Sequence, residues 1–195
     1  MADWREEMAK SKWGSSYEIN GYGDLFYALV KLVRPKKIVE LGVKAGYSTY
    51  FMAKALKEIG SGNIDAYDLW EEYQFHSCKK SEAEENLKEF KGIINLYQQD
   101  VTGIEKNYEN VDILHIDLGN HGEILDNVLL PWISKINSFV IIEGGSEERD
   151  KVDWIKKYNK TPLNEWFEKN KDRIEKFTFS PFPSLTLIKP KRQAI

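Results

Sequence analysis

The sequence contains one cysteine and no long hydrophobic run. A single cysteine, Cys78, excludes both an internal disulfide and a zinc site built from several cysteines, and we interpret it as a free thiol in a reducing compartment. No stretch approaches the roughly 20 apolar residues of a membrane span, and the charged start, MADWREEMAK, lacks the apolar core of a signal peptide. We therefore expect a cytoplasmic protein with no membrane partner.

The sequence also has no excess of positively charged residues. The chain has 28 lysines and arginines against 31 aspartates and glutamates, a net charge of −3, which gives no electrostatic footprint for nucleic acid. We therefore expect no nucleic-acid partner. The 195 residues, 42% of them hydrophobic, suit one domain over residues 1–195 that buries its own core. A homodimer is the assembly we expect if the chain associates, because dimers are the commonest soluble oligomers.

Short apolar runs alternate with helix-like stretches along most of the chain. The alternation predicts a Rossmann-like α/β fold: a doubly wound, mostly parallel, seven-stranded sheet. The last two strands have no helix between them, so they should form a C-terminal antiparallel β-hairpin. The expected strands are 37–41, 64–68, 94–98, 111–117, 138–143, 174–180 and 184–189. The expected helical parts are an N-terminal segment over 1–34, then 46–58, 71–90 and 124–136, and pieces of a polar insertion over 144–171.

The clearest local pattern is the glycine-containing turn in IVELGVKAGYST, residues 38–49. Gly42 lets the backbone pass close to a ligand, and Gly46 permits close approach of the following helix. The first helical turn, with Ser48 and Thr49, leaves main-chain amides free to face a ligand. Glu40, at the strand end, is placed to order the loop by accepting its amides. The alternative is a plain strand-to-helix turn with two glycines.

A dinucleotide site is a competing interpretation of this turn. Its G-x-G-x-x-G pattern needs a middle glycine where the pyrophosphate lies. Lys44 occupies that place, so an NAD-linked oxidoreductase is disfavoured but stays an alternative.

Acidic residues follow the next two predicted strands. Asp68, at the tip of the second strand, can accept both hydroxyls of a ribose, although aspartate also favours turns and helix caps. Asp100, after the third strand, can accept from an adenine amino group while Val101 packs on the ring. Because parallel strands end at one edge of a sheet, these groups should line one crevice.

Together with His115-Ile-Asp117, this series resembles the motifs of class I S-adenosylmethionine-dependent methyltransferases. The first motif is most similar to that of small-molecule O-methyltransferases of the catechol and macrocin type. The resemblance, over roughly residues 20–145, implies S-adenosylmethionine as cofactor and methyl transfer to a small polar acceptor, at oxygen. It implies Glu40 and Gly42 near the methionine end, Asp68 on the ribose and Asp100 by the adenine. The whole expected cofactor site is Glu40, Gly42, Gly46, Ser48, Thr49, Asp68, Asp100, Val101 and Asp117.

Metal-dependent relatives hold a divalent cation with carboxylates at the fourth and fifth strand tips. Asp117 and Glu143 are then the candidate ligands, and oxygen ligands favour Mg²⁺. The sequence departs from that pattern twice: Asp117 and His121 are separated by one residue more than usual, and Gly144 stands where a second polar ligand is common. A family member that binds the nucleotide or a metal without methyl transfer therefore stays an alternative.

His121, just past the fourth strand, is the leading candidate for a general base, and Asp117 is the other candidate catalytic residue. A surface histidine at a helix start is the alternative for His121, and His115 is expected to pack in the core. The insertion 144–171 is a candidate lid near the acceptor, with Arg149 pairing an anionic substrate. The alternative is a helix capped by Ser146 with an exposed Arg149.

Overall fold

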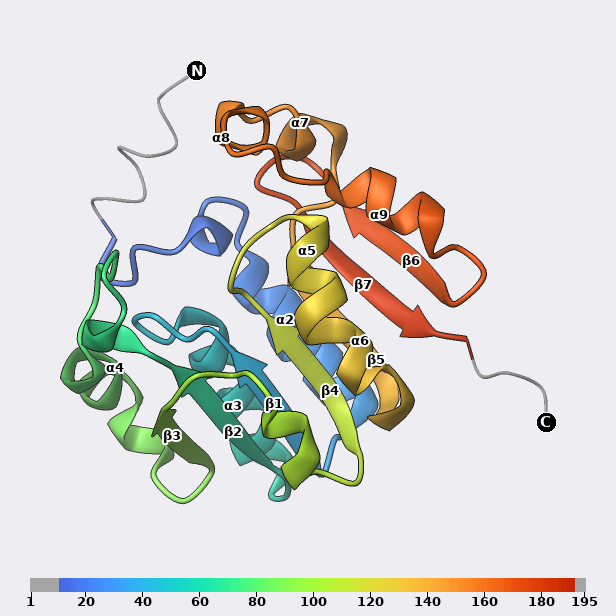
Figure 1. Cartoon of the computed structure of the whole chain (residues 1–195). Helices are drawn as coiled ribbons and strands as arrows, with labels where there is room; N and C mark the ends of the chain where they lie inside the picture. Colours follow the sequence, from blue (N-terminus) through green and yellow to red (C-terminus); the bar gives the residue numbers. More distant parts are fainter. Residues whose placement is uncertain (1–10, 192–195) are drawn as a thin grey trace. The chain divides into compact units, whose positions relative to one another are not determined.

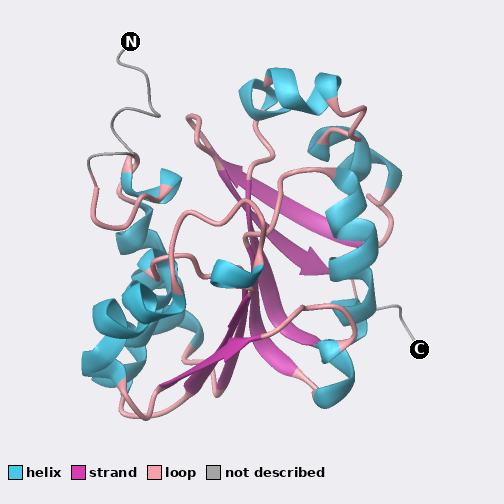
Figure 2. Cartoon of the chain, turned by 60° about the vertical axis from the view of Figure 1, so that its left-hand side comes forward, coloured by secondary structure: helices cyan, strands magenta, loops and turns pink. Residues whose placement is uncertain are grey.

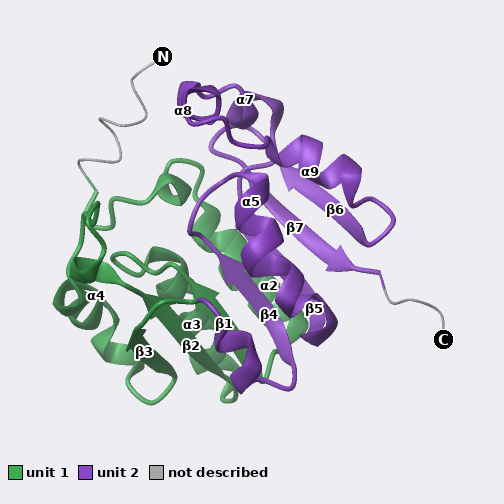
Figure 3. Ribbon diagram, in the orientation of Figure 1, with its two compact units in different colours: residues 1–101 green, residues 102–195 purple. Residues whose placement is uncertain are grey.

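The computed structural model describes residues 11–191, so the first part of the predicted segment 1–34 lies outside the described residues (Figure 1). Helices flank a mixed sheet whose strand order is β3-β2-β1-β4-β5-β7-β6 (Figure 2). The predicted Rossmann-like sheet, mostly parallel with an antiparallel C-terminal hairpin, is confirmed. Two compact units make up the chain, residues 1–101 and 102–195 (Figure 3).

The first unit contains three parallel strands and the helices between them. Strand β1 pairs with β2, and β2 pairs with β3. All but the first residue of β1 are buried, as expected for a strand covered on both faces. The elements are η1 (Ser16–Glu18), α2 (Tyr22–Val33), β1 (Lys37–Leu41), α3 (Tyr47–Ile59), β2 (Asn63–Asp68), η2 (Trp70–Glu72), α4 (Lys80–Leu87), η3 (Lys88–Phe90) and β3 (Ile94–Gln98).

The second unit contains one parallel pair, β4 and β5, and two antiparallel pairs, β5 with β7 and β6 with β7. Its elements are η4 (Ile104–Asn107), β4 (Val111–Ile116), α5 (Gly122–Ile124), the π-helical turn η5 (Leu125–Leu129), α6 (Leu130–Trp132), η6 (Ile133–Lys135), β5 (Ile136–Glu143), α7 (Glu147–Asp150), α8 (Asp153–Lys157), α9 (Leu163–Lys169), β6 (Ile174–Phe179) and β7 (Leu185–Pro190). The predicted insertion is therefore helical in pieces, as expected.

The helix predicted over 71–90 is interrupted at residues 73–79. Residues 71–90 do not form one helix, because only Lys80–Leu87 is α-helical. Trp70 has a left-handed φ of 44° and is buried, with its indole Nε1 donating to the Lys44 carbonyl at 2.9 Å. Packing of the Trp70 side chain interrupts the helical backbone. The helix α4 begins further along the chain, where the Glu82 carboxylate accepts from the Lys79 amide.

The helical region after β4 is continuous from Gly122 to Lys135 but irregular. The amide of Leu130 bonds to the carbonyl of Leu125, five residues back, just before Pro131. Proline lacks the amide that an α-helix needs at its position, and the chain before Pro131 forms a π-helical turn. Within residues 11–191, no helix is both long and apolar enough to span a membrane.

Candidate functional site

The loop between β1 and α3 has the shape that its glycines predict. Gly42 and Gly46 both have a φ of 91°, a conformation that residues with a Cβ disfavour. At Gly46 a Cβ would lie 2.8 Å from Cδ1 of Leu87 in α4. Gly46 therefore lies in close contact with α4, and a larger residue there would push Leu87 away.

The side chain of Asp68 holds this loop in place. Its Oδ2 accepts the main-chain amides of Val43 and Lys44, each at 2.8 Å, and its Oδ1 accepts the amide of Trp70 at 2.7 Å. Lys44 has a φ of 54°, so the carboxylate stabilises a strained turn. Accepting the loop amides is the role predicted for Glu40, and the structure gives it to Asp68.

Glu40 instead binds the first turn of α3. Its side chain is fully buried, and its two oxygens accept the hydroxyls of Ser48 and Thr49, each at 2.5 Å. A buried carboxylate needs such donors to offset the loss of water. Glu40, Ser48 and Thr49 therefore form one buried group that fixes the end of β1 to the start of α3.

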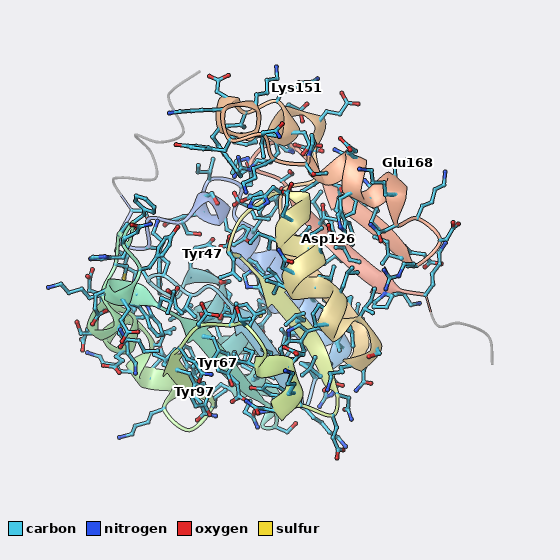
Figure 4. All side chains as sticks on the ribbon, viewed as in Figure 1. Tyr47, Tyr67, Tyr97, Asp126, Lys151 and Glu168 are labelled. Atoms are coloured by element: carbon cyan, nitrogen blue, oxygen red, sulfur yellow. The ribbon has the colours of Figure 1, made fainter. Side chains whose placement is uncertain are left out.

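The expected residues after β3 lie beside this loop. Gln98 in β3 pairs with Asp68 in β2, and the Gln99 amide donates to the Asp68 carbonyl at 3.1 Å. One register position earlier, Tyr67 and Tyr97 stack with ring centroids 4.8 Å apart (Figure 4). Asp100, which is exposed, and Val101, which is half-buried, follow directly. Within the first unit, the structure thus places Gly42, Gly46 and the partners of Glu40 and Asp68 at the β1–α3 loop, and places Asp100 and Val101 after the strand that neighbours β2.

In the second unit, His121 begins α5 and is held by Glu123. The His121 Nδ1 lies 2.7 Å from Oε2 of Glu123, and the imidazole packs edge-on against Trp154, with ring centroids 5.8 Å apart. Burial raises the pKa of Glu123, but hydrogen bonds from its own amide, from Thr161 and from His121 outweigh it and lower the pKa to about 2. An ionised carboxylate only accepts, so Nδ1 carries the proton and Nε2 is the basic nitrogen.

The sequence reasoning missed Glu123, whose carboxylate lies 2.7 Å from Nδ1 of the candidate base His121. The sequence offers one clue to its contact with His121, namely a carboxylate two residues after a histidine at a helix start. The amide and hydroxyl of Thr161, 38 positions away, complete its hydrogen bonds, and no local pattern shows that contact.

Glu143, at the end of β5, lies against an amide and a guanidinium. Its Oε2 accepts from Nδ2 of Asn120 at 2.6 Å and lies 3.9 Å from Nη2 of Arg149. Ser146 caps α7 by accepting the Arg149 amide at 3.3 Å, so the predicted cap is confirmed. The same alternative expected Arg149 to be exposed. That expectation is wrong, because Arg149 is only 9% exposed.

This set of groups does not fit a divalent cation. Among residues 11–191, no three His, Cys, Asp or Glu side chains gather so that they could hold a metal. Gly144 has a φ of 100°, and a Cβ there would lie 2.8 Å from Leu163, so a second ligand has no place beside Glu143. Arg149, which is always charged, supplies positive charge beside Glu143. Mg²⁺ at Asp117 and Glu143 thus finds no support, although Asp117 lies half-buried directly after β4 as expected.

The remaining histidine prediction concerns the interior of β4. His115 is fully buried, which confirms it as a core residue. Cys78 is buried and forms no disulfide, consistent with a free thiol.

Comparison with known proteins places this geometry in a family. Residues 39–143 match the family model described as a methyltransferase domain. No curated protein sequence matches the chain significantly.

Solved structures share the fold at low identity. The S-adenosylhomocysteine-bound methyltransferase PaMTH1 of Podospora anserina has a TM-score of 0.68 at 14% identity, over 98% of this chain and 89% of that chain. An O-methyltransferase of Bacillus cereus in complex with S-adenosylhomocysteine has a TM-score of 0.67 at 14% identity, over 96% and 90%. The O-methyltransferase TomG of Streptomyces achromogenes, in complex with S-adenosylmethionine, has a TM-score of 0.64 at 13% identity, over 98% and 91%.

Proposed function

Because this chain belongs to the methyltransferase-domain family, we propose that it transfers the methyl group of S-adenosylmethionine to an oxygen atom of a small polar acceptor. The observation that carries the proposal is where the family match falls. Residues 39–143 include the loop between β1 and α3, the strand tips that follow it, and both His121 and Glu123. The structural neighbours bound to S-adenosylmethionine or S-adenosylhomocysteine support the same cofactor.

The charge of the β1–α3 loop favours this cofactor over NAD. The amides of Val43 and Lys44, which a pyrophosphate would need, already donate to the Asp68 carboxylate. A second carboxylate, Glu40, lies buried at the start of α3. Two carboxylates around the loop repel a dinucleotide's pyrophosphate and tolerate the cationic sulfonium and ammonium of S-adenosylmethionine.

Asp68 has less capacity left for a ribose than the sequence suggests. A carboxylate offers roughly four acceptor positions, and main-chain amides occupy three of them. We therefore propose that Asp68 mainly fixes the loop and accepts one ribose hydroxyl. Asp100, Val101 and Asp117 stay proposed contacts of the cofactor.

When bound, S-adenosylmethionine supplies an electrophilic methyl group. That methyl group would pass to the acceptor oxygen, and the electron pair of the broken sulfur–carbon bond would stay on sulfur. His121 takes the hydroxyl proton at Nε2, and Glu123 stabilises the imidazolium that results. An imidazole base suits an oxygen acceptor, because a hydroxyl must lose its proton and histidine exchanges protons near neutral pH.

The test uses S-adenosylmethionine with an isotopically labelled methyl carbon, incubated with the protein and a pool of small metabolites. Nuclear magnetic resonance separates methoxy carbons from N-methyl and C-methyl carbons. We expect protein-dependent labelled methoxy signals that persist with a metal chelator. A labelled methyl on nitrogen or carbon would overturn the oxygen assignment. Protein-dependent reduction of NAD without methyl transfer would overturn the family-level function.

A further inference from the structure

Arg149 is a buried cation whose Nε has no hydrogen-bond partner among residues 11–191. That Nε is shielded from solvent, and the whole residue is only 9% exposed. The nearest carboxylate, Glu143, is 3.9 Å from Nη2, which is beyond hydrogen-bond distance. An unsatisfied buried donor destabilises a fold, so a buried guanidinium in this state indicates a site for a ligand's acceptor atoms.

The surroundings hold the guanidinium in place without satisfying it. Its carbon lies 5.7 Å from the Trp154 ring centroid and 5.8 Å from that of Phe182. Cation–π contacts of this kind fix the orientation and leave the N–H groups at the edge for a ligand. The backbone at Arg149 is fixed as well, since its amide donates to Ser146.

The turn after β5 is shaped to place this arginine. Gly144 and Gly145 have φ values of 100° and 97°, and a Cβ at Gly145 would lie 2.2 Å from Oγ1 of Thr186. That Thr186 hydroxyl donates to the Gly144 carbonyl at 2.6 Å. The two glycines let the chain fold back after Glu143, which brings Arg149 beside that carboxylate.

Trp154 connects this arginine to the proposed base. The Arg149 guanidinium carbon lies 5.7 Å from the Trp154 ring centroid, and the His121 ring centroid lies 5.8 Å from it. Arg149 and His121 therefore border the same indole.

We propose that Arg149 binds a carboxylate of the acceptor, so that the acceptor is a small hydroxylated carboxylic acid whose hydroxyl reaches His121. This inference rests on the proposed function. A planar guanidinium pairs with a carboxylate through two parallel hydrogen bonds. Glu143 selects against more highly charged groups: a carboxylate adds one negative charge beside it, and a phosphate adds nearly two.

The test measures binding of small probes to the protein saturated with S-adenosylhomocysteine. The probes are the three hydroxybenzoates and lactate, compared with phenol, phenyl phosphate and inorganic phosphate. Calorimetry gives their affinities for the wild type, Arg149→Met, Arg149→Lys and the control Lys151→Met. Lys151 lies directly after α7, the helix that contains Arg149 (Figure 4). Its side chain, however, is 71% exposed and pairs with Glu147.

We expect at least one hydroxy acid to bind the wild type more tightly than phenol or phenyl phosphate does. Its affinity should fall at least about tenfold in Arg149→Met, less in Arg149→Lys, which keeps the charge but lacks Nε, and less than about twofold in Lys151→Met. Equal affinity in the wild type and Arg149→Lys, absence of binding by every hydroxy acid, or tighter binding of phenyl phosphate would overturn the inference. A separate titration with S-adenosylmethionine tests the proposed function by itself. The wild type and Arg149→Lys should bind that cofactor equally well even if no hydroxy acid binds.

Discussion

At the scale of single residues, Glu123 links the start of α5 to the insertion. It accepts the Thr161 amide and hydroxyl and faces Nδ1 of His121. These contacts stabilise the ionised carboxylate and hold its pKa at about 2, against an ordinary value of 4.5. The same contacts leave Nε2 of His121 as the basic atom.

Glu123 should make stability depend on acidity in a defined range. Because its folded pKa is lowered, its contribution is complete above the unfolded value of 4.5 and is lost as the pH falls toward about 2. We expect the melting temperature of the wild type to exceed that of Glu123→Gln by a margin that shrinks across this range. Thermal melts at several pH values measure the margin. A margin independent of pH would show that Glu123 is not ionised in the fold.

His121 should matter for transfer and not for cofactor binding. We expect His121→Ala to lower the rate of labelled methyl transfer at least about a hundredfold, the usual size of a general-base contribution. Its affinity for S-adenosylmethionine should stay within about twofold of the wild type. Full residual transfer in His121→Ala would exclude it as the base.

Cys78 should be protected in the folded protein. Desolvation, with Glu82 and Asp68 nearby, raises the pKa of its thiol to about 11 from 9.0, and the residue is 6% exposed. Since the thiolate is the reactive form, a disulfide reagent near about pH 8 should react slowly with native protein and completely after unfolding. Equally fast reaction in both states would contradict this burial.

At the scale of elements, the β1–α3 turn shows what sequence can and cannot predict. Its glycines and its place between a strand and a helix were readable, because positive φ and close packing restrict the residue types allowed. That Asp68 and not Glu40 accepts the loop amides was not readable, since it depends on the left-handed turn at Lys44. The break in the helix predicted over 71–90 likewise depends on where Trp70 packs.

Asp68 should therefore affect stability before any ligand binds. An asparagine there keeps one acceptor oxygen, so Asp68→Asn leaves main-chain amides of the turn unpaired. We expect the free energy of unfolding without cofactor to fall by about 1–3 kcal/mol. Glu72→Gln is the control: Glu72 is exposed in the same unit, and its change should stay within about 0.5 kcal/mol. Urea unfolding measures both, and equal effects would reject the structural role of Asp68.

At the scale of the whole molecule, the alternation of apolar runs and helical stretches predicted the sheet and its antiparallel end. The hydrophobic pattern alone sets that architecture, because each strand must be covered on its apolar faces. The second-unit site was less predictable. Arg149, Glu123 and Trp154 contact their partners through packing of the insertion, which no short-range pattern in the sequence specifies.

Binding of S-adenosylmethionine at the β1–α3 turn is measured by calorimetric titration. The wild type and Asp68→Asn are titrated with S-adenosylmethionine, S-adenosylhomocysteine and NAD. We predict one site per chain for the first two compounds, weaker in Asp68→Asn, and no binding of NAD. Binding of NAD with no binding of S-adenosylmethionine would contradict the proposed cofactor site.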